Sequence, residues 1–254
     1  MNIKNYTNRI GYKDNIEITE SCLRELHKCH VMSIPFEAID VYMGRRIELD
    51  LESIYHKVIN KQRGGYCYEL NYLFHKMLSE VGFPNFMISA SIFNEDQFGP
   101  EFDHMAIIVE LEDQWLVDVG FGDLFIEPIK IETQHKQHDK LKIYEIKKIC
   151  PNEYILYEYL TIEAKPAVKY NFGIEPREIS EFTEQNNWKQ TSDESFFVKN
   201  RICTLPMEKG RKTIFNDFYK TKSNGESKEI KIEGNLMFIK LLKDEFQIDI
   251  ENTP

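Results

Sequence analysis

The chain has 254 residues, enough for one large domain or roughly two to three small ones, and 42% of them are hydrophobic, including 17 Phe and 13 Tyr. This composition excludes an intrinsically disordered chain. The net charge of −10 argues against nucleic acid or an anionic membrane as the main partner, and no apolar run approaches the roughly 18–20 residues that span a bilayer.

The cysteines indicate a reducing environment. There are five of them, odd in number and scattered, so no disulfide framework is expected. The chain starts without the apolar segment of a signal peptide, and we therefore expect a cytoplasmic location. No Cys-x-x-Cys pair exists, and Cys29 is adjacent to His30, so we expect no metal site.

The first 84 residues have helical patterns. A helix is predicted between Thr19, an N-cap residue, and Pro35, which disfavours the α conformation in the residue before it. Asp50 is placed to cap a second helix, and the pair Gly64-Gly65 is predicted to end it. Its apolar residues recur at i, i+3, i+4, i+7 and i+8: Leu51, Ile54, Tyr55, Val58 and Ile59.

A third helix is predicted to begin after this glycine pair and to end near Gly82, with Cys67 in its first turn. A helix N-terminus carries a partial positive charge, which favours ionisation of a thiol, and the thiolate is the nucleophilic form. Cys67 is therefore a candidate catalytic nucleophile. A buried, inert cysteine is the alternative interpretation, and the local pattern leaves both open.

Strand patterns dominate from about residue 86. Strands are predicted at 86–92, 104–111, 115–119, 141–149 and 154–162, the second and third forming a hairpin. The last part is mixed: a short helix at 176–187, strands at 213–219 and 228–232 around the turn Asn224-Gly225, and a closing helix capped by Asn235. Helices followed by antiparallel strands and a mixed unit indicate an α+β fold that contains a small barrel or sandwich.

A nucleophilic cysteine needs a base, and His104 is the best candidate because it stands at the start of a predicted strand. The other histidines are less well placed. His56 and His75 fall on surface-like helical positions, His135 and His138 lie in a charged loop, and His27 and His30 have no nearby orienting group in the sequence.

Asp118 is the best candidate to orient this base. Its carboxylate interrupts an apolar run, where burial is costly without a partner; a turn or cap interaction with nearby N–H groups is the structural alternative. In an ideal hairpin that turns at 112–114, His104 lies opposite residue 121 or 122, roughly 10–13 Å along the ladder from Asp118. A direct contact therefore requires a bulge, a bend, or a strand that leaves the ladder.

Several phenylalanines lie near these elements. Phe36 follows the break after the first helix, Phe121 is held between two glycines beside Asp118, and Phe196-Phe197 comes later. Ordinary core packing explains any one of them in a chain with 17 phenylalanines. Phe121 is the hardest to assign to packing alone.

These segments, in this order, resemble the arylamine N-acetyltransferases. The resemblance covers nearly the whole chain, and two segments are highly specific together: Arg63-Gly64-Gly65-Tyr66-Cys67-Tyr68-Glu69-Leu70-Asn71 and Leu116-Val117-Asp118-Val119-Gly120-Phe121-Gly122. Further matching segments are Ile34-Pro35-Phe36-Glu37, His104 with the apolar strand after it, and the weaker segments 187–197 and 210–213.

The resemblance implies a three-part fold with a cysteine-protease-like Cys67–His104–Asp118 core. It places a helical bundle with the nucleophile at 1–84, an antiparallel β-barrel with the histidine and the aspartate at 85–188, and an α/β lid at 189–254. It also implies that Phe36, Phe121 and Phe197 line the acceptor pocket and that Gly122 and Asp123 lie near CoA.

The implied activity is xenobiotic metabolism by acetyl transfer from acetyl-CoA to arylamines, arylhydrazines or arylhydroxylamines. The implied route is ping-pong, through an acetyl-cysteine thioester. Two alternatives stay open: a papain-like thiol hydrolase or amidase, which uses water as acceptor, and a pocket that only binds an aromatic ligand. The sequence does not specify the oligomeric state.

Overall fold

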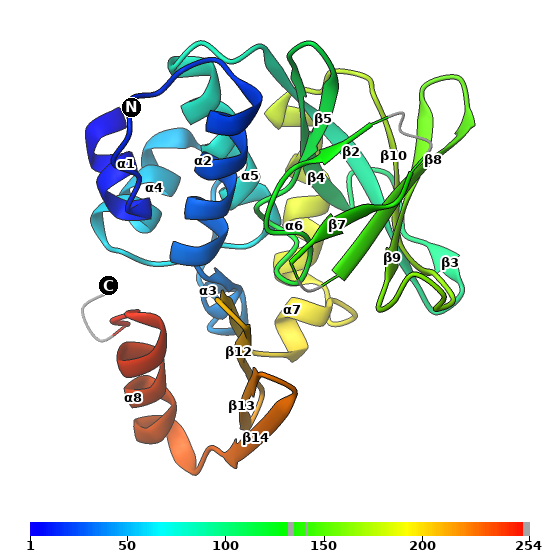
Figure 1. Cartoon of the computed structure of the whole chain (residues 1–254). Coiled ribbons are helices and arrows are strands. Elements are labelled where there is room, and N and C mark those ends of the chain that lie inside the picture. The colour runs from blue at the N-terminus through cyan, green and yellow to red at the C-terminus, as the bar shows by residue number, and fades with distance from the viewer. Residues whose placement is uncertain (132–134, 141, 251–254) are drawn as a thin grey trace.

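The computed structural model of the protein describes residues 1–131, 135–140 and 142–250 (Figure 1). Its N-terminal part is helical, and its innermost helix is α5, most of whose residues are buried. The helices of this part are α1 (Ile3–Ile10), α2 (Glu20–Ser33), α3 (Ile39–Tyr42), α4 (Leu51–Tyr55), the π-helical turn η1 (His56–Asn60) and α5 (Cys67–Glu80).

Both predicted helix caps in this part are confirmed. Thr19 Oγ1 accepts a hydrogen bond from the backbone N–H of Cys22 at 3.3 Å, which starts α2. The carboxylate of Asp50 accepts the N–H groups of Glu52 and Ser53 at 3.0 and 3.2 Å, which starts α4. The second helix then widens into the π-helical η1, a change that apolar periodicity does not distinguish from a continuous α-helix.

The prediction that Gly64-Gly65 ends the second helix is wrong, because η1 already ends at Asn60. The glycines serve a close backbone contact instead. A Cβ on Gly64 would lie 2.1 Å from the carbonyl oxygen of Pro35. The carbonyl of Gly65 accepts the N–H of Glu37 at 2.9 Å. The two glycines therefore let the segment before Cys67 lie directly against the chain that follows α2.

The middle of the chain forms a nearly closed antiparallel barrel (Figure 1). Among the described residues its strand order is β6-β5-β4-β2-β10-β9-β8-β7, with β3 paired to β2. The side chain of Gln137 in β7 accepts the N–H of Lys130 in β6 at 2.9 Å and donates to its carbonyl at 2.8 Å, which joins the two edges. The strands are β2 (Asn85–Asn94), β3 (Gln97–Phe98), β4 (His104–Glu110), β5 (Gln114–Val117), β6 (Ile129–Lys130), β7 (Gln137–Asp139), β8 (Lys142–Cys150), β9 (Glu153–Tyr159) and β10 (Ala167–Gly173).

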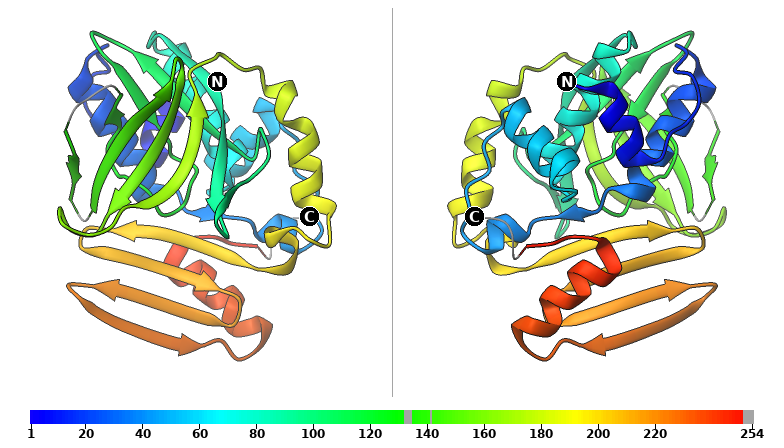
Figure 2. Two further views of the ribbon diagram at one scale, coloured as in Figure 1. Left: turned by 90° about the vertical axis from the view of Figure 1, so that its right-hand side faces the viewer. Right: turned by 90° about the vertical axis from the view of Figure 1, so that its left-hand side faces the viewer.

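A second antiparallel sheet follows, with the order β1-β11-β12-β13-β14, and α8 lies across one of its faces (Figure 2). Its first strand comes from the N-terminal part, so the chain returns here to the helical region. The strands of this sheet are β1 (Phe36–Glu37), β11 (Ile202–Met207), β12 (Gly210–Phe215), β13 (Phe218–Ser223) and β14 (Glu226–Lys231), and the helix on its face is α8 (Gly234–Phe246). Between the barrel and β11 the chain forms the 3₁₀ helix η2 (Ile179–Phe182), α6 (Thr183–Thr191) and α7 (Phe196–Lys199).

Three of the predicted C-terminal elements differ in the structure, and β11 lies where no strand is predicted. The predicted strand at 213–219 is wrong, because Asn216, with φ of 50°, turns the chain between β12 and β13. The predicted helix at 176–187 divides into η2 and α6. The closing helix begins at Gly234 rather than after Asn235. The turn at Asn224-Gly225 is confirmed, with φ of 52° and 82°. Residue 141 of the predicted strand 141–149 lies outside the described residues.

The α+β class with its helical bundle, barrel and α/β unit is confirmed, while domain boundaries near residues 84 and 188 stay a prediction. Helix α5 packs against β4 and β2 on the outside of the barrel. This packing brings the first turn of α5 to the point where β4 starts and β5 ends. Within the described part of the chain, every helix is too short or too polar to cross a membrane.

Candidate active site

Cys67 is the first residue of α5, and its side chain is buried. The backbone of Gly120 lies directly against it: a Cβ on Gly120 would be 2.7 Å from the carbonyl oxygen of Cys67 and 2.9 Å from its Cα. The two most specific sequence segments therefore meet in space, because the glycine of one has no side chain to hold the other away.

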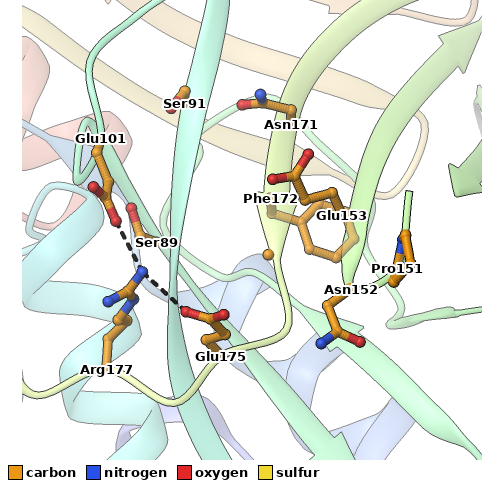
Figure 3. A pocket seen from close by; sticks show the side chains of 11 residues that line it. Ser89, Ser91, Glu101, Pro151, Asn152, Glu153, Asn171, Phe172, Glu175 and Arg177 are labelled. Atoms are coloured by element: carbon orange, nitrogen blue, oxygen red, sulfur yellow. Dashed lines mark hydrogen bonds and ion pairs between the residues drawn. The ribbon is translucent and has the colours of Figure 1, made fainter. Parts of the chain in front are cut away.

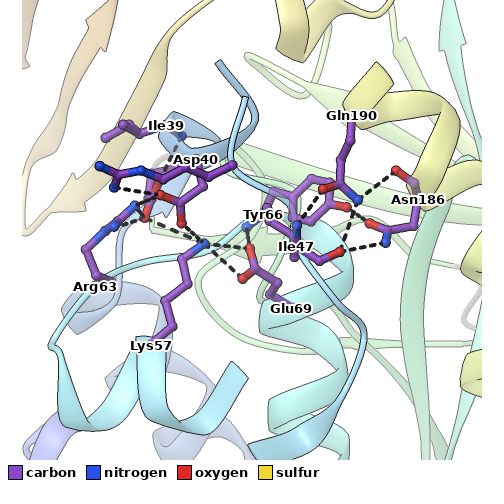
Figure 4. A network of polar contacts seen from close by, with 11 residues as sticks. Ile39, Asp40, Ile47, Lys57, Arg63, Tyr66, Glu69, Asn186 and Gln190 are labelled. Carbon is purple, nitrogen blue, oxygen red and sulfur yellow. Dashed lines mark hydrogen bonds and ion pairs between the residues drawn. The ribbon is translucent and has the colours of Figure 1, made fainter. Parts of the chain in front are cut away.

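The loop before Cys67 is held by buried charges (Figure 4). Nη2 of Arg63, whose side chain is 1% exposed, lies 2.7 Å from the carboxylate of Glu37 and 3.0 Å from that of Asp40. Lys57 Nζ lies 2.9 Å from the other oxygen of Asp40. Asp40 thus joins the π-helical turn to the loop, and each buried charge has an opposite partner.

Glu69 connects this network to the start of α5 (Figure 4). Its carboxylate accepts Lys57 Nζ at 2.9 Å and the backbone N–H of Tyr66 at 3.1 Å. Burial raises the pKa of Glu69 although Lys57 acts in the opposite direction. The residue before Cys67 is therefore fixed by a side chain of the same helix that carries Cys67.

His104 and Asp118 are in direct contact. Nε2 of His104 lies 2.7 Å from Oδ2 of Asp118, and both residues are buried. Ile107 is opposite Val117, the last pair of the hairpin, so β5 ends there and Asp118 leaves the ladder. Of the three geometries that allow the contact, the structure uses the departure of a strand.

Where β5 ends, side-chain atoms take the place of the neighbouring strand as acceptors of backbone hydrogen bonds. The N–H of Asp118 donates to Nε2 of His27 at 3.3 Å, that of Val119 donates to Oδ1 of Asn71 at 2.9 Å, and that of Gly120 donates to Oδ1 of Asp118 at 3.0 Å. Three consecutive N–H groups are thus satisfied without strand pairing.

The carboxylate of Asp118 accepts two further side-chain hydrogen bonds. Nδ2 of Asn71 donates to Oδ1 at 2.9 Å, and the hydroxyl of Tyr170 donates to Oδ2 at 3.2 Å. The sequence analysis missed both donors. Asn71 lies one turn after Cys67 in the same motif, so the i, i+4 spacing could have indicated it. Tyr170 comes from β10, and no sequence signal links that strand to the site.

The pKa values indicate a charged pair. Burial alone would lower the pKa of His104, but the Asp118 carboxylate and the hydrogen-bonded sulfur of Cys67 raise it to about 10. Burial would raise the pKa of Asp118, but His104 and the bonds from Asn71 and Gly120 hold it below its usual value. Because Nε2 of His104 faces Asp118, we infer that Nδ1 is the nitrogen that bonds Cys67.

The three predicted pocket phenylalanines fall into two groups. The ring of Phe121 contacts His104 edge-on, with 5.4 Å between centroids. The rings of Phe36 and Phe197 are 6.2 Å apart. Gly122 links the groups, because a Cβ there would lie 3.0 Å from the ring of Phe36. The lining of an acceptor pocket by these residues stays a prediction.

Asp123, a predicted CoA contact, lies among cations. Its carboxylate is 2.9 Å from Lys142 Nζ and 3.1 Å from Arg211 Nε, and these charges hold its pKa below the usual value against the effect of burial. Lys169 Nζ lies 5.1 Å from the centroid of the Phe121 ring. A group of basic side chains thus stands beside the loop after Phe121.

A hollow of about 280 Å³ lies on the other face of the barrel sheet (Figure 3). Ala90 is the ladder partner of His104, so its neighbours Ser89 and Ser91 point to the opposite face. Arg177 in this hollow is already paired with Glu101 at 2.9 Å. Its lining residues do not include Cys67, His104 or Asp118, so the hollow is separate from the cysteine site.

The described residues contain no group of three His, Cys, Asp or Glu side chains arranged to hold a metal ion. The site that they do form is a buried cysteine, histidine and aspartate, a set of residue types that can activate a thiol as a nucleophile.

Comparisons with known proteins agree with this geometry. A family model described as N-acetyltransferase matches residues 21–254. The arylamine N-acetyltransferase pineal gland isozyme NAT-10 of Gallus gallus is 30% identical, over 99% of this chain and 95% of that protein. The solved arylamine N-acetyltransferase of Salmonella typhimurium is 25% identical with a TM-score of 0.91, over 98% of this chain and 93% of that one.

A further structure, the arylamine N-acetyltransferase of Mycobacterium marinum in complex with CoA, has the same fold, with 23% identity and a TM-score of 0.90, over 100% of this chain and 95% of that one. The family model and the 30% identical relative each cover nearly all of the chain. The chain therefore belongs to the arylamine N-acetyltransferase family of acyltransferases.

Proposed function

We propose that this protein transfers an acetyl group from acetyl-CoA to the nitrogen of an arylamine, arylhydrazine or arylhydroxylamine, through a thioester on Cys67. The contact of His104 with both Asp118 and the Cys67 thiol carries this proposal. A buried imidazolium, stabilised by a carboxylate, is the form that results when the thiol gives its proton to His104.

In the first half-reaction the Cys67 sulfur attacks the carbonyl carbon of acetyl-CoA, and the carbon–sulfur bond to CoA breaks. The CoA sulfur leaves with the proton held on Nδ1 of His104. N–H groups in the first turn of α5 are available to stabilise the developing oxyanion, because a helix leaves its first N–H groups without intrahelical partners. The acetyl group remains on Cys67.

In the second half-reaction the acceptor nitrogen attacks the thioester carbon while neutral His104 takes the proton from that nitrogen. The carbon–sulfur bond to Cys67 breaks, and the imidazolium–thiolate pair is restored. Phe36, Phe121 and Phe197 supply the aromatic surface on which a flat acceptor is expected to rest. Such an aromatic surface agrees with xenobiotic aromatic compounds as the acceptors.

The basic side chains beside Asp123 support acetyl-CoA as the donor. Lys142, Lys169 and Arg211 could pair with the phosphates of CoA next to Gly122 and Asp123. The CoA-bound Mycobacterium marinum relative shows that this fold holds CoA in that protein.

Mass spectrometry of the protein after acetyl-CoA treatment tests the proposal. We expect one added acetyl group, on the peptide that contains Cys67, and its loss when an arylamine is added. Cys150 is exposed and serves as an internal control for nonspecific labelling. Label on Cys150, or no label, contradicts the proposal. Hydrolysis of acetyl-CoA without any stimulation by an arylamine would favour the thiol hydrolase instead.

A further inference from the structure

Two histidines of α2 take no part in the proposed chemistry. His27 and His30 are both fully buried, one turn apart on the same helix. The ring of His30 is hydrogen-bonded to the hydroxyl of Tyr6 in α1. His27 instead reaches the triad, but it contacts the backbone of Asp118 rather than the carboxylate.

The hydrogen bonds of His27 fix its protonation. Its Nε2 accepts the backbone N–H of Asp118 at 3.3 Å, and its Nδ1 lies 2.7 Å from the carbonyl oxygen of Ile126. A backbone N–H can only donate and a carbonyl can only accept, so the ring is neutral with its proton on Nδ1. Burial lowers the pKa of His27 to about 4, against the effect of its hydrogen bonds, which agrees with a neutral ring.

The surroundings of His27 are otherwise apolar. Its ring stacks on Phe125 with 5.6 Å between centroids and meets the edge of Phe74 at 6.0 Å. The charged or titratable groups that act on it are Asp118 and, on its own helix, Arg24 and His30.

His27 thus forms a hydrogen bond with each end of the loop from Asp118 to Ile126. At the first end, Asp118 is the residue where β5 leaves the ladder, so its N–H has no strand partner. A buried N–H without an acceptor is costly, and the chain would relax by rotating this peptide. Such a rotation would move the attached carboxylate away from Nε2 of His104.

We propose that His27 is a positioning residue for acetyl transfer: Nε2 of its ring accepts the N–H of Asp118 and so fixes the place where the Asp118 carboxylate meets His104. This role rests on the proposed function of the triad. His27 supports the contact between His104 and Asp118 from α2, whereas Asn71 supports it from α5.

Three variants separate this role from simple packing. His27→Gln keeps an acceptor near the position of Nε2, whereas His27→Asn keeps only the part of the side chain near Nδ1. His30→Asn is the matched control, because it makes the same change at an equally buried histidine of the same helix. Should His27→Asn not fold, His27→Met fills the site without an acceptor and replaces it in the comparison.

The readouts are kcat for acetyl transfer and the rate of Cys67 alkylation by iodoacetamide as a function of pH. With Asp118 displaced, His104 holds the proton of the thiol less well. We expect His27→Asn to lower kcat by about 10- to 100-fold, as small misplacements of catalytic groups do. The alkylation midpoint should move to higher pH by about one unit. His27→Gln and His30→Asn should keep the wild-type midpoint.

An unchanged midpoint in His27→Asn, or the same shift in His30→Asn or His27→Gln, would overturn the positioning role. Failure of the proposed function is seen separately, in the wild-type protein. In that case acetyl-CoA leaves no acetyl group on Cys67, whatever the variants do.

Discussion

Replacement of Asp118 by Asn is expected to reverse a hydrogen bond at the centre of the site. Oδ1 of Asp118 accepts from Asn71 and Gly120, and Oδ2 accepts from Nε2 of His104. The two donors at Oδ1 hold the asparagine oxygen in that place, so its NH₂ group must face His104. Nε2 then has to accept, and the ring proton moves to Nδ1.

This tautomer is the wrong one for a base. In a neutral ring that carries its proton on Nδ1, this nitrogen cannot accept the proton of the Cys67 thiol. An imidazolium, if it formed, would also lack its negative partner. Loss of the corresponding aspartate in a serine-protease triad, with the geometry intact, lowers kcat by about 10⁴-fold. We expect a fall of roughly 10³- to 10⁴-fold in kcat/KM for acetyl-CoA, because the same tautomer change applies.

Stopped-flow measurement of Cys67 acetylation gives this rate directly, and circular dichroism checks that the variant folds. Asp139→Asn is the matched control, because Asp139 is also a buried carboxylate that accepts a backbone N–H, that of Ile126 at 2.8 Å. A folded Asp118→Asn variant that reacts within tenfold of wild type would refute the tautomer argument.

Three further outcomes are expected. Gly64→Ala places a methyl group 2.1 Å from a backbone carbonyl oxygen and should cost about 3 kcal/mol of stability, seen as a lower Tm; an unchanged Tm would contradict the close contact. The His104 pKa is raised to about 10, so the stability it contributes is present below about pH 6.5 and is lost as the pH rises through 10. The Tm difference between wild type and Asp118→Asn should therefore shrink from neutral pH to pH 10, and a constant difference would argue against the charged pair. Arg211→Gln removes a cation beside Asp123 and should raise KM for acetyl-CoA about tenfold with KM for the arylamine unchanged; equal changes in both would contradict a phosphate contact.

Local patterns predict much of the helical part. Thr19 and Asp50 are caps in the sequence and in the structure, and Cys67 lies in the first turn of a helix in both. These features depend on neighbours within a few residues, so short-range rules capture them. Gly64-Gly65 has the same local appearance as a helix end. Its role depends on Pro35, almost thirty positions earlier, and no local rule contains that contact.

In the site too, some features are predictable from the local sequence and others depend on distant contacts. Its three residue types and their order are readable from the sequence, but the contact of His104 with Asp118 depends on where β5 leaves its partner. That point is set by acceptors from two helices, His27 in α2 and Asn71 in α5. Tyr170 reaches the same carboxylate from β10, a strand that joins the sheet on the other side of β2. Such long-range placements have no periodic signature.

The two-residue strand β1 has a mechanical consequence. Glu37 donates its N–H to the carbonyl of Gly65, two residues before Cys67, while Phe36 and Glu37 also pair with β11 of the C-terminal sheet. The backbone of this dipeptide is therefore shared between two parts of the molecule that are distant in sequence. Opening of the C-terminal sheet would remove one side of that support and loosen the loop that presents Cys67. Amide exchange at Glu37 should accordingly be as slow as in the core of α5, so that the C-terminal sheet and the segment before Cys67 unfold as one cooperative unit.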